Sequence, residues 1–258
     1  MPDAAPAARA GMLRVEHVMG MPVSLDLADD LPAERLEHLA DEAFAWLREV
    51  DARFSTYKTD SEVTRLARGE LRVEECSADL REVLDRCGDL WRATDGYFDV
   101  YAAGALDPSG YVKGWAVQVA SDRLVASGST NHCLNAAGDL VVRGGPRPGE
   151  PRRIGIRHPF QPQAVCWVLA VSDIAVATSG TYERGLHVID PHTGRPAEDL
   201  CSVTVVGPDL GTADAYATAA VAMGLKGLDW LARLADHESA AVTQDARAFR
   251  SDNLPLAQ

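Results

Sequence analysis

The chain reads VATSGTYERGLHVIDPHTG over residues 176–194 and TADAYAT over residues 212–218. The first stretch joins apolar segments through Gly and Asp-Pro turns, a pattern typical of strands. The second opens an Ala-rich helix in which Asp214 and Thr218 stand four residues apart, so both side chains face one direction. Together they predict a fold of strands and helices, with a site that holds a phosphate-bearing ligand through a divalent metal.

The neighbouring sequence extends this pattern in both directions. Helical spacing predicts helices over residues 32–50, 62–67, 79–94, 113–126, 213–223 and 227–236. Strands are expected within 13–27 and at the C-terminal end, and above all between 132 and 207, in HCLNA, DLVVRG, RRIGIRH, VCWVLAVS, AVATS, LHVID and SVTVVG. Strands that cluster rather than alternate with helices indicate an α+β fold. We expect two closely fused lobes of mixed β-sheet with flanking helices and a ligand cleft between them.

Composition narrows the function classes. The 258 residues include 38 acids and 25 bases, a formal net charge of −13, which opposes binding to nucleic acid or to an anionic membrane. Five scattered cysteines without a C-x-x-C pair indicate reduced thiols and disfavour zinc. Residues 1–12 are Ala- and Pro-rich and are expected to be a disordered tail before a domain at 13–258. No leader or membrane span is visible, so the chain is expected to be cytoplasmic.

Single motifs leave structural interpretations open. Asp214 also suits a first helical turn, and Thr218 also suits a threonine that bonds back within its helix. The turn from Asp107 to Lys113 precedes a helix, so it suits an anion site and an ordinary Pro-Gly turn equally. Neither a P-loop nor a dinucleotide-binding glycine motif is present. His187 lies in an apolar segment, where histidines are more often structural than catalytic.

In series, however, the motifs resemble those of one family. The order MG, FSTY, TDGYFD, DPSGxxKG, ATSGxYxRGxHxIDPxTGxP, SVTVVGP and ADAYATA spans about residues 13–224. This order is similar to that of the FAD:protein FMN transferases, the ApbE-type family, whose members bind FAD with Mg²⁺ and transfer FMN to a Thr or Ser of a target protein. The resemblance implies an enzyme, a transferase that releases AMP.

The resemblance also implies site residues. Mg²⁺ would be held by the Gly110 carbonyl and by the side chains of Asp214 and Thr218. The catalytic set would be His187, Asp214 and Lys113, with His187 the first candidate for the base and Asp214 the second. Contacts to FAD would come from Met19, Tyr57, Tyr97, Phe98, Asp99, Asp107, Lys113 and Val188. The implied partner is an acceptor protein with a short Asp-Gly-x-[Thr/Ser]-Gly-[Ala/Ser]-[Thr/Ser] flavinylation motif.

Two rival functions share the same residues. A Mg²⁺-dependent FAD pyrophosphatase would use water in place of the acceptor and release FMN and AMP, and a flavin-binding protein would not turn over. The chain also departs from the family pattern, with Val100 where a proline is common and Ala137 where a second glycine is usual. We expect Ala137 to crowd a backbone approach to the ligand.

Overall fold

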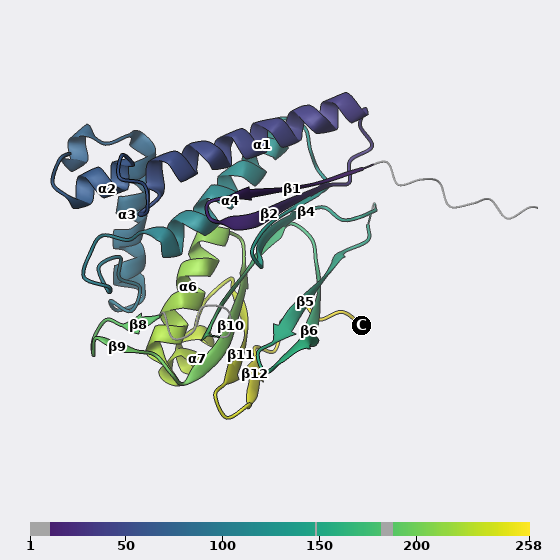
Figure 1. Ribbon diagram of the computed structural model, residues 1–258. Coiled ribbons are helices and arrows are strands. Elements are labelled where there is room, and N and C mark those ends of the chain that lie inside the picture. The colour runs from purple at the N-terminus through teal and green to yellow at the C-terminus, as the bar shows by residue number, and fades with distance from the viewer. Residues whose placement is uncertain (1–10, 148, 182–187) are drawn as a thin grey trace, which may run out of the picture.

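The computed structural model describes residues 11–147, 149–181 and 188–258. A central sheet is covered by helices on one face and by a separate hairpin on the other (Figure 1). The sheet strands are β1 (Met12–Val18), β2 (Met21–Leu27), β3 (His132–Ala136), β4 (Asp139–Arg143), β7 (Ile174–Gly180), β10 (Leu200–Gly207), β11 (Glu238–Thr243) and β12 (Ala248–Arg250). They lie in the order β1-β2-β3-β4-β7-β10-β11-β12, and each neighbouring pair is antiparallel.

The remaining elements cover this sheet. The second layer is the hairpin β5 (Arg152–His158) and β6 (Gln161–Val171), and a short ladder joins β8 (Ile189–Asp190) to β9 (Arg195–Pro196). The helices are α1 (Ala33–Phe54), α2 (Glu62–Ala67), α3 (Ala78–Ala93), α4 (Ser109–Ala126), α6 (Leu210–Met223) and α7 (Lys226–Leu231), with a 3₁₀ turn η1 (Val73–Glu75). None of the helices in the described residues is long and apolar enough to span a bilayer.

Polar side chains cap the first turns of three helices, α2, α3 and α6. Ser61 Oγ accepts from the Thr64 N–H at the start of α2, and Ser77 Oγ accepts from the Leu80 N–H at the start of α3. Asp209 Oδ1 accepts from the Thr212 N–H at 2.7 Å at the start of α6. Each bond satisfies a backbone donor that would have no partner inside its helix.

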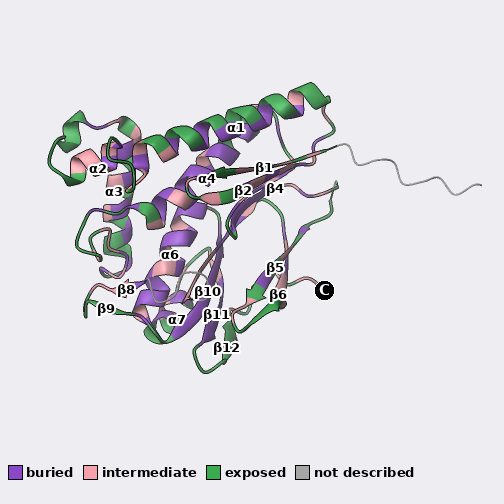
Figure 2. Cartoon of the chain, viewed as in Figure 1, coloured by how far each residue is buried: buried purple, intermediate pink, exposed green. Residues whose placement is uncertain are grey.

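Alternation along the strands separates two apolar cores. Val23, Leu25 and Leu27 on β2 face the helices and are fully buried. On the opposite face, Leu140 of β4 and Val176 of β7 pack with the β5–β6 hairpin. The strands at the centre of the sheet and the helices α4 and α6 are therefore buried along most of their length (Figure 2).

Two tight turns lie at the same end of the sheet. β1 and β2 are joined by Met19-Gly20, with φ values of 56° and 73°, and β3 and β4 by Ala137-Gly138, with φ values of 50° and 101°. Positive φ at both central residues is the type I′ pattern, which matches the twist of paired strands. The Ala137 N–H donates to Pro22 O at 3.3 Å, which places the second turn against the first residues of β2.

The α+β class and the flanking helices predicted from the sequence are confirmed. The pairing differs in detail from the expected mixed β-sheet, because eight of the described strands form one continuous antiparallel sheet, with β5–β6 and β8–β9 as separate antiparallel pairs. Short hairpin turns at β1–β2 and β3–β4 fix antiparallel neighbours. Predicted boundaries shift as well: α4 begins at Ser109 rather than 113, α6 begins at Leu210, and α7 ends at Leu231 rather than 236. Residues 1–10 of the predicted tail lie outside the described residues, and β1 already includes Met12.

Candidate active site

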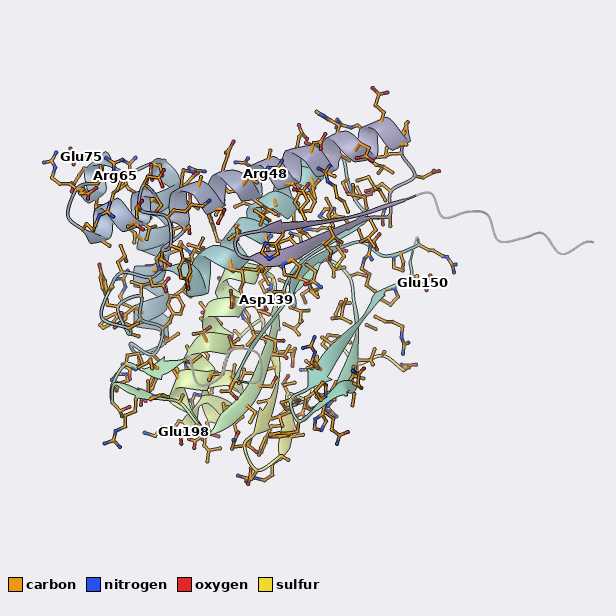
Figure 3. The ribbon with its side chains drawn as sticks, viewed as in Figure 1. Arg48, Arg65, Glu75, Asp139, Glu150 and Glu198 are labelled. Carbon is orange, nitrogen blue, oxygen red and sulfur yellow. The ribbon has the colours of Figure 1, made fainter. Side chains whose placement is uncertain are left out.

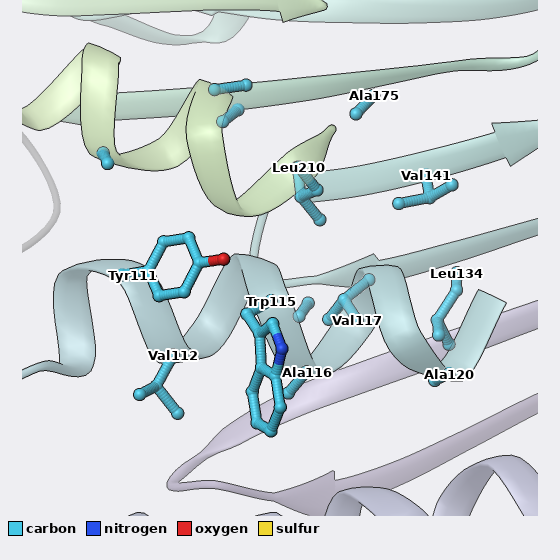
Figure 4. Packing of buried hydrophobic residues seen from close by; sticks show 14 of the residues in the cluster. Tyr111, Val112, Trp115, Ala116, Val117, Ala120, Leu134, Val141, Ala175 and Leu210 are labelled. Carbon is cyan, nitrogen blue, oxygen red and sulfur yellow. The ribbon is translucent and has the colours of Figure 1, made fainter. Parts of the chain in front are cut away.

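The site is built where α4 and α6 cross closely. A Cβ placed on Gly114 of α4 would lie 2.6 Å from Leu210 O and 2.9 Å from Gly211 Cα, both on α6. Glycine on both helices therefore permits backbone contact that a side chain would prevent. Figure 4 shows the apolar surroundings of this crossing, with Tyr111 and Trp115 on α4 beside Leu210. Lys113 precedes Gly114, and Asp214 follows Gly211 by three residues, so the crossing brings their side chains together.

One ammonium group lies between two buried carboxylates. Lys113 Nζ forms an ion pair with Asp139 Oδ2 and lies 3.5 Å from Asp214 Oδ2. The two aspartates are 1% and 2% exposed. Neither Oδ2 atom has a partner in hydrogen-bond geometry among the described residues, although Lys113 is within ion-pair distance of both. The three groups carry a formal charge of −1 when both carboxylates are ionised.

Burial changes the pKa of one of the two site carboxylates, Asp214. Burial raises the pKa of Asp214 to about 7; the Lys113 ammonium lowers it, and the nearby Asp139 carboxylate raises it. A second cation beside the two carboxylates would favour the ionised form of Asp214. Within the described part of the site, one ammonium group faces two carboxylates.

The donor set fits a hard divalent cation. Carboxylate, hydroxyl and carbonyl oxygens are the ligands that Mg²⁺ takes, and it is commonly bound through one or two carboxylates with substrate phosphates completing the shell. Thr218 lies one turn after Asp214 on α6, and its Oγ1 is 3.0 Å from Ser179 Oγ of β7. Among the described residues no group of three or more His, Cys, Asp or Glu is placed to hold a metal ion.

The loop before α4 places several of the predicted FAD contacts. Asp107 Oδ1 accepts from the Ser109 N–H at 3.0 Å and so defines the entry to the helix. A Cβ on Gly110 would lie 3.3 Å from the ring of Phe98, which is 4% exposed, so that ring packs directly under the first turn of α4. Asp99 Oδ1 accepts from the Tyr101 N–H at 2.7 Å.

The β8–β9 ladder is anchored to the same loop. The Tyr97 ring meets His192 edge to face with 4.4 Å between ring centroids, and His192 Nε2 donates to Asp95 O at 2.9 Å. Val188, another predicted FAD contact, is buried, and its carbonyl accepts from the Ala197 N–H at 2.9 Å. Residues 94–99 and 188–197, far apart in the chain, are thus held together beside α4.

Other predicted residues are placed differently. Met19 occupies the first central position of the β1–β2 turn. The Tyr57 side chain is 97% exposed, so the structure does not bring its ring against the Lys113 site. His187, the first candidate for the base, lies outside the described residues.

The ApbE family model matches residues 19–105 and 101–242 of the chain. The chain belongs to the ApbE family. Over 129 residues it is 38% identical to the FAD:protein FMN transferase of Vibrio cholerae, a match covering 46% of this chain and 39% of that protein. Over 160 residues it is 34% identical to the protein of the same name from Rhodobacter capsulatus, covering 58% of this chain and 30% of that one. The chain thus spans well under half the length of these two relatives.

Solved ApbE structures share the fold. The flavin transferase ApbE from Vibrio cholerae superposes with a TM-score of 0.83 at 24% identity, covering 96% of this chain and 99% of that one. The ApbE protein from Thermotoga maritima gives a TM-score of 0.86 at 20% identity, covering 96% of this chain and all of that one. The sheet, the flanking helices and the hairpin layer are therefore the arrangement of this fold.

In this ApbE-family chain, Asp139 is the site residue that sequence reasoning missed. It lies near the centre of the molecule (Figure 3), and its Oδ1 accepts from the Thr178 N–H at 2.7 Å while Oδ2 faces Lys113. The Ala137-Gly138 turn directly before it fixes the direction in which β4 starts. The available signal was an aspartate immediately after a two-residue turn, at the first position of a buried strand.

Proposed function

We propose that this chain is an FAD:protein FMN transferase that uses Mg²⁺. The observation that carries the proposal is the Lys113 ammonium between the buried carboxylates of Asp139 and Asp214, whose Oδ2 atoms lack hydrogen-bond partners among the described residues. Membership of the ApbE family and the name of the Vibrio cholerae relative supply the substrate class. A pyrophosphate ester is an anion that such a lysine and a divalent cation would together neutralise.

The proposed reaction exchanges a phosphoanhydride bond for a phosphoester bond. The hydroxyl oxygen of an acceptor Thr or Ser attacks the phosphorus on the FMN side of the FAD pyrophosphate. The bond from that phosphorus to the bridging oxygen breaks, and AMP leaves with the bridging oxygen. The hydroxyl proton passes to a base, so the products are an FMN phosphoester on the acceptor and AMP.

The chain's own residues divide this work. Lys113 Nζ would contact the phosphate oxygens on which charge accumulates in the transition state. Asp214, Thr218 and the Gly110 carbonyl would hold Mg²⁺, which when bound supplies positive charge that polarises the phosphates. Asp139 would act through Lys113, because its Oδ1 is fixed by the Thr178 N–H and its Oδ2 fixes the ammonium.

FAD would extend from this point along the loops beside α4. The Tyr97-Phe98-Asp99 turn, Asp107 and Val188 would contact it, with Met19 and Tyr57 at the margins. Tyr57 is 97% exposed, so a contact with FAD would bury its ring. The proton acceptor is His187 by sequence reasoning, and the cytoplasmic location likewise stays a prediction of the sequence.

Intact-mass spectrometry of an acceptor fragment tests the proposal. The fragment carries the Asp-Gly-x-Thr-Gly-Ala-Thr motif and is incubated with the protein, FAD and Mg²⁺. The expected result is a mass gain of one FMN less water, with equimolar AMP. Asp214→Asn should abolish the gain, whereas Asp41→Asn should not, because Asp41 forms an exposed ion pair with Arg14 at 2.6 Å outside the site.

The same experiment separates the rival functions. Free FMN and AMP in place of the adduct would identify a pyrophosphatase, since water would then have replaced the acceptor hydroxyl. FAD that binds but stays intact with the fragment and Mg²⁺ present would identify a binding protein. Either result contradicts the proposed transfer.

A further inference from the structure

Two adjacent residues of β7 reach the candidate site in different ways. The backbone N–H of Thr178 donates to Asp139 Oδ1 at 2.7 Å, while its side chain lines the hollow between the sheet and the β5–β6 hairpin. Side chains alternate along a strand, so that of Ser179 faces the helices, and its Oγ lies 3.0 Å from Thr218 Oγ1 on α6. The end of β7 therefore contacts a site carboxylate through its backbone and the proposed metal-binding hydroxyl through a side chain.

The contact between Ser179 and Thr218 differs from the one that a helical threonine commonly makes. Ser and Thr hydroxyls inside helices can bond back to the carbonyl four residues earlier. Among the described residues, however, the hydrogen-bond partner of the Thr218 hydroxyl is Ser179. The hydroxyl is thus held across the interface between α6 and β7 and not by its own helix.

The strand that carries Ser179 is firmly fixed at this point. β7 lies between β4 and β10 inside the sheet, and Ser179 pairs in register with Val203 of β10, which is fully buried. The preceding residue is fixed as well, because Thr178 Oγ1 lies 2.8 Å from Thr204 Oγ1, which is also fully buried. A side chain on a central, paired strand has a defined position, so Ser179 can set the orientation of the Thr218 hydroxyl.

We infer that Ser179 is a positioning residue for the metal-binding hydroxyl of Thr218. The inference rests on the proposed function, in which Thr218 is a ligand of Mg²⁺. A hydroxyl oxygen that binds a cation is a poor acceptor and a strong donor. Thr218 would then donate its proton to Ser179 Oγ, which leaves the Thr218 lone pairs for the cation. Without the Ser179 oxygen, the proton loses this acceptor and the hydroxyl can turn towards its own helix.

Mn²⁺ binding measures this role directly. Mn²⁺ takes the same oxygen ligands as Mg²⁺, and the EPR signal of the free ion shows how much of it the FAD-loaded protein has bound. Ser179→Ala is compared with Ser251→Ala, which removes a hydroxyl that accepts from the Ser239 N–H at 2.9 Å directly after the edge strand β12. A second pair, Ser179→Thr and Ser179→Val, adds similar bulk at one position and differs in the hydroxyl.

The hydroxyl of residue 179 is expected to determine the affinity for the metal. Ser179→Ala and Ser179→Val should bind Mn²⁺ at least about tenfold more weakly than the parent, as is usual when an outer partner of a metal ligand is removed. Ser179→Thr should bind Mn²⁺ more tightly than Ser179→Val, and Ser251→Ala should bind it as the parent does. In transfer assays of Ser179→Ala, the half-saturating Mg²⁺ concentration should change more than kcat.

The inference and the proposed function can fail separately. Equal Mn²⁺ affinities of Ser179→Ala and the parent overturn the inference, and so do equal affinities of Ser179→Thr and Ser179→Val, because the hydroxyl would then be irrelevant. A parent that binds no Mn²⁺ in the presence of FAD overturns the metal site and the inference together. If Mn²⁺ binding depends on the hydroxyl but no FMN adduct forms on the acceptor fragment, the role of Ser179 is supported and the proposed transfer is contradicted.

Discussion

At the residue scale, the decisive feature is the unequal charge around Lys113. Asp139 and Asp214 are both almost fully buried and share one ammonium. Removing one partner of a buried charge cluster ordinarily destabilises a protein, because it leaves a charge uncompensated. Among the described residues, two carboxylates share one ammonium group, so we expect that removing the charge of one aspartate brings the charges closer to balance and displaces the lysine.

Asp139→Asn should therefore separate stability from activity. We expect transfer to fall by about 10²–10³, which corresponds to about 3–4 kcal/mol of transition-state stabilisation. The fall should appear in kcat more than in FAD affinity, because Lys113 is displaced while the flavin contacts remain. Chemical denaturation should show an unfolding free energy no lower than that of the parent. A loss of stability that parallels the loss of activity would make Asp139 a structural residue only.

His132 provides a second residue-scale test. It is fully buried on β3, with Nε2 2.8 Å from Ser121 Oγ and Nδ1 2.9 Å from Ser129 Oγ, and Ser129 Oγ in turn donates to Asp29 Oδ2 at 2.6 Å. Burial lowers the pKa of His132 from 6.5 to about 4. Between these values the unfolded chain takes up a proton that the folded chain does not, so this histidine makes stability fall as the pH falls.

The contribution of His132 to the pH dependence of the unfolding free energy can be measured by comparing the parent with a variant that lacks this histidine. Asp214, with its pKa raised from 3.8 to about 7, acts in the opposite direction over nearly the same range, since the folded state then binds the extra proton. We therefore compare the parent with His132→Asn by denaturant titration. The destabilisation caused by the variant should shrink by about 3 kcal/mol between pH 7 and pH 4. If the difference in unfolding free energy between the parent and the variant did not change with pH, the pKa of His132 would not be lowered in the folded protein.

Residue-level roles were predictable only in part. Asp214 and Thr218 were singled out because helical spacing aligns i and i+4, and Lys113 because it follows a turn at a helix start; their roles stay predictions. Asp139 was missed because its importance comes from contacts with Lys113, 26 positions earlier, and Thr178, 39 positions later in the sequence. The exposure of Tyr57 could not be predicted either, since the sequence does not tell whether an aromatic ring packs in a core or lies on the surface.

At the element scale, the α4–α6 crossing sets the distance between Lys113 and Asp214. Gly114→Ala would place a methyl group 2.6 Å from Leu210 O, so the helices have to move apart. We expect a loss of about 1–3 kcal/mol in unfolding free energy, together with a loss of transfer activity. Thermal unfolding and intact-mass assays measure the two effects.

The matched control is a glycine in an open helix. A Cβ on Gly88 of α3 would meet only Arg92 Nη1, at 3.7 Å. Gly88→Ala should stabilise the protein by up to about 1 kcal/mol through helix propensity and leave transfer unchanged. If Gly114→Ala and Gly88→Ala changed stability and transfer activity to the same extent, the close α4–α6 crossing would not explain the effect of Gly114→Ala.

Most elements were predictable from periodicity, and their ends were not. Apolar spacing identified α1, α2, α3 and most strands, because these elements present one apolar face to a core. The first turn of α4 was missed because Ser109 and Gly110 are poor helix formers, and they are held by the Asp107 carboxylate, which accepts from the Ser109 N–H, and by the Phe98 ring. Sheet order was beyond sequence reasoning, since β4 pairs with β7 and bypasses the intervening hairpin.

At the scale of the whole molecule, two buried carboxylates share one ammonium group among the described residues, so we expect the apo protein to be less stable than its fold allows. Ligands that supply positive charge should restore this stability by linkage. We expect Mg²⁺ with FAD to raise Tm more than FAD alone. Asp214→Asn should unfold at a higher temperature than the parent in the apo form at pH 8, and its Tm should not respond to Mg²⁺. Calorimetry at fixed pH gives the Tm of the parent and of the variant with and without Mg²⁺. If the Tm of Asp214→Asn still rose with Mg²⁺, Asp214 would not be a ligand of the metal.

The amide nitrogen of Thr178 donates to Asp139 on the catalytic side of the sheet, while the same residue lines the hollow between the sheet and the β5–β6 hairpin. The ¹⁵N resonance of Thr178 should therefore shift when Mg²⁺ and FAD bind beside Asp139, and it should respond separately to a molecule that enters the hollow. One nucleus would then report the occupancy of both faces of the sheet.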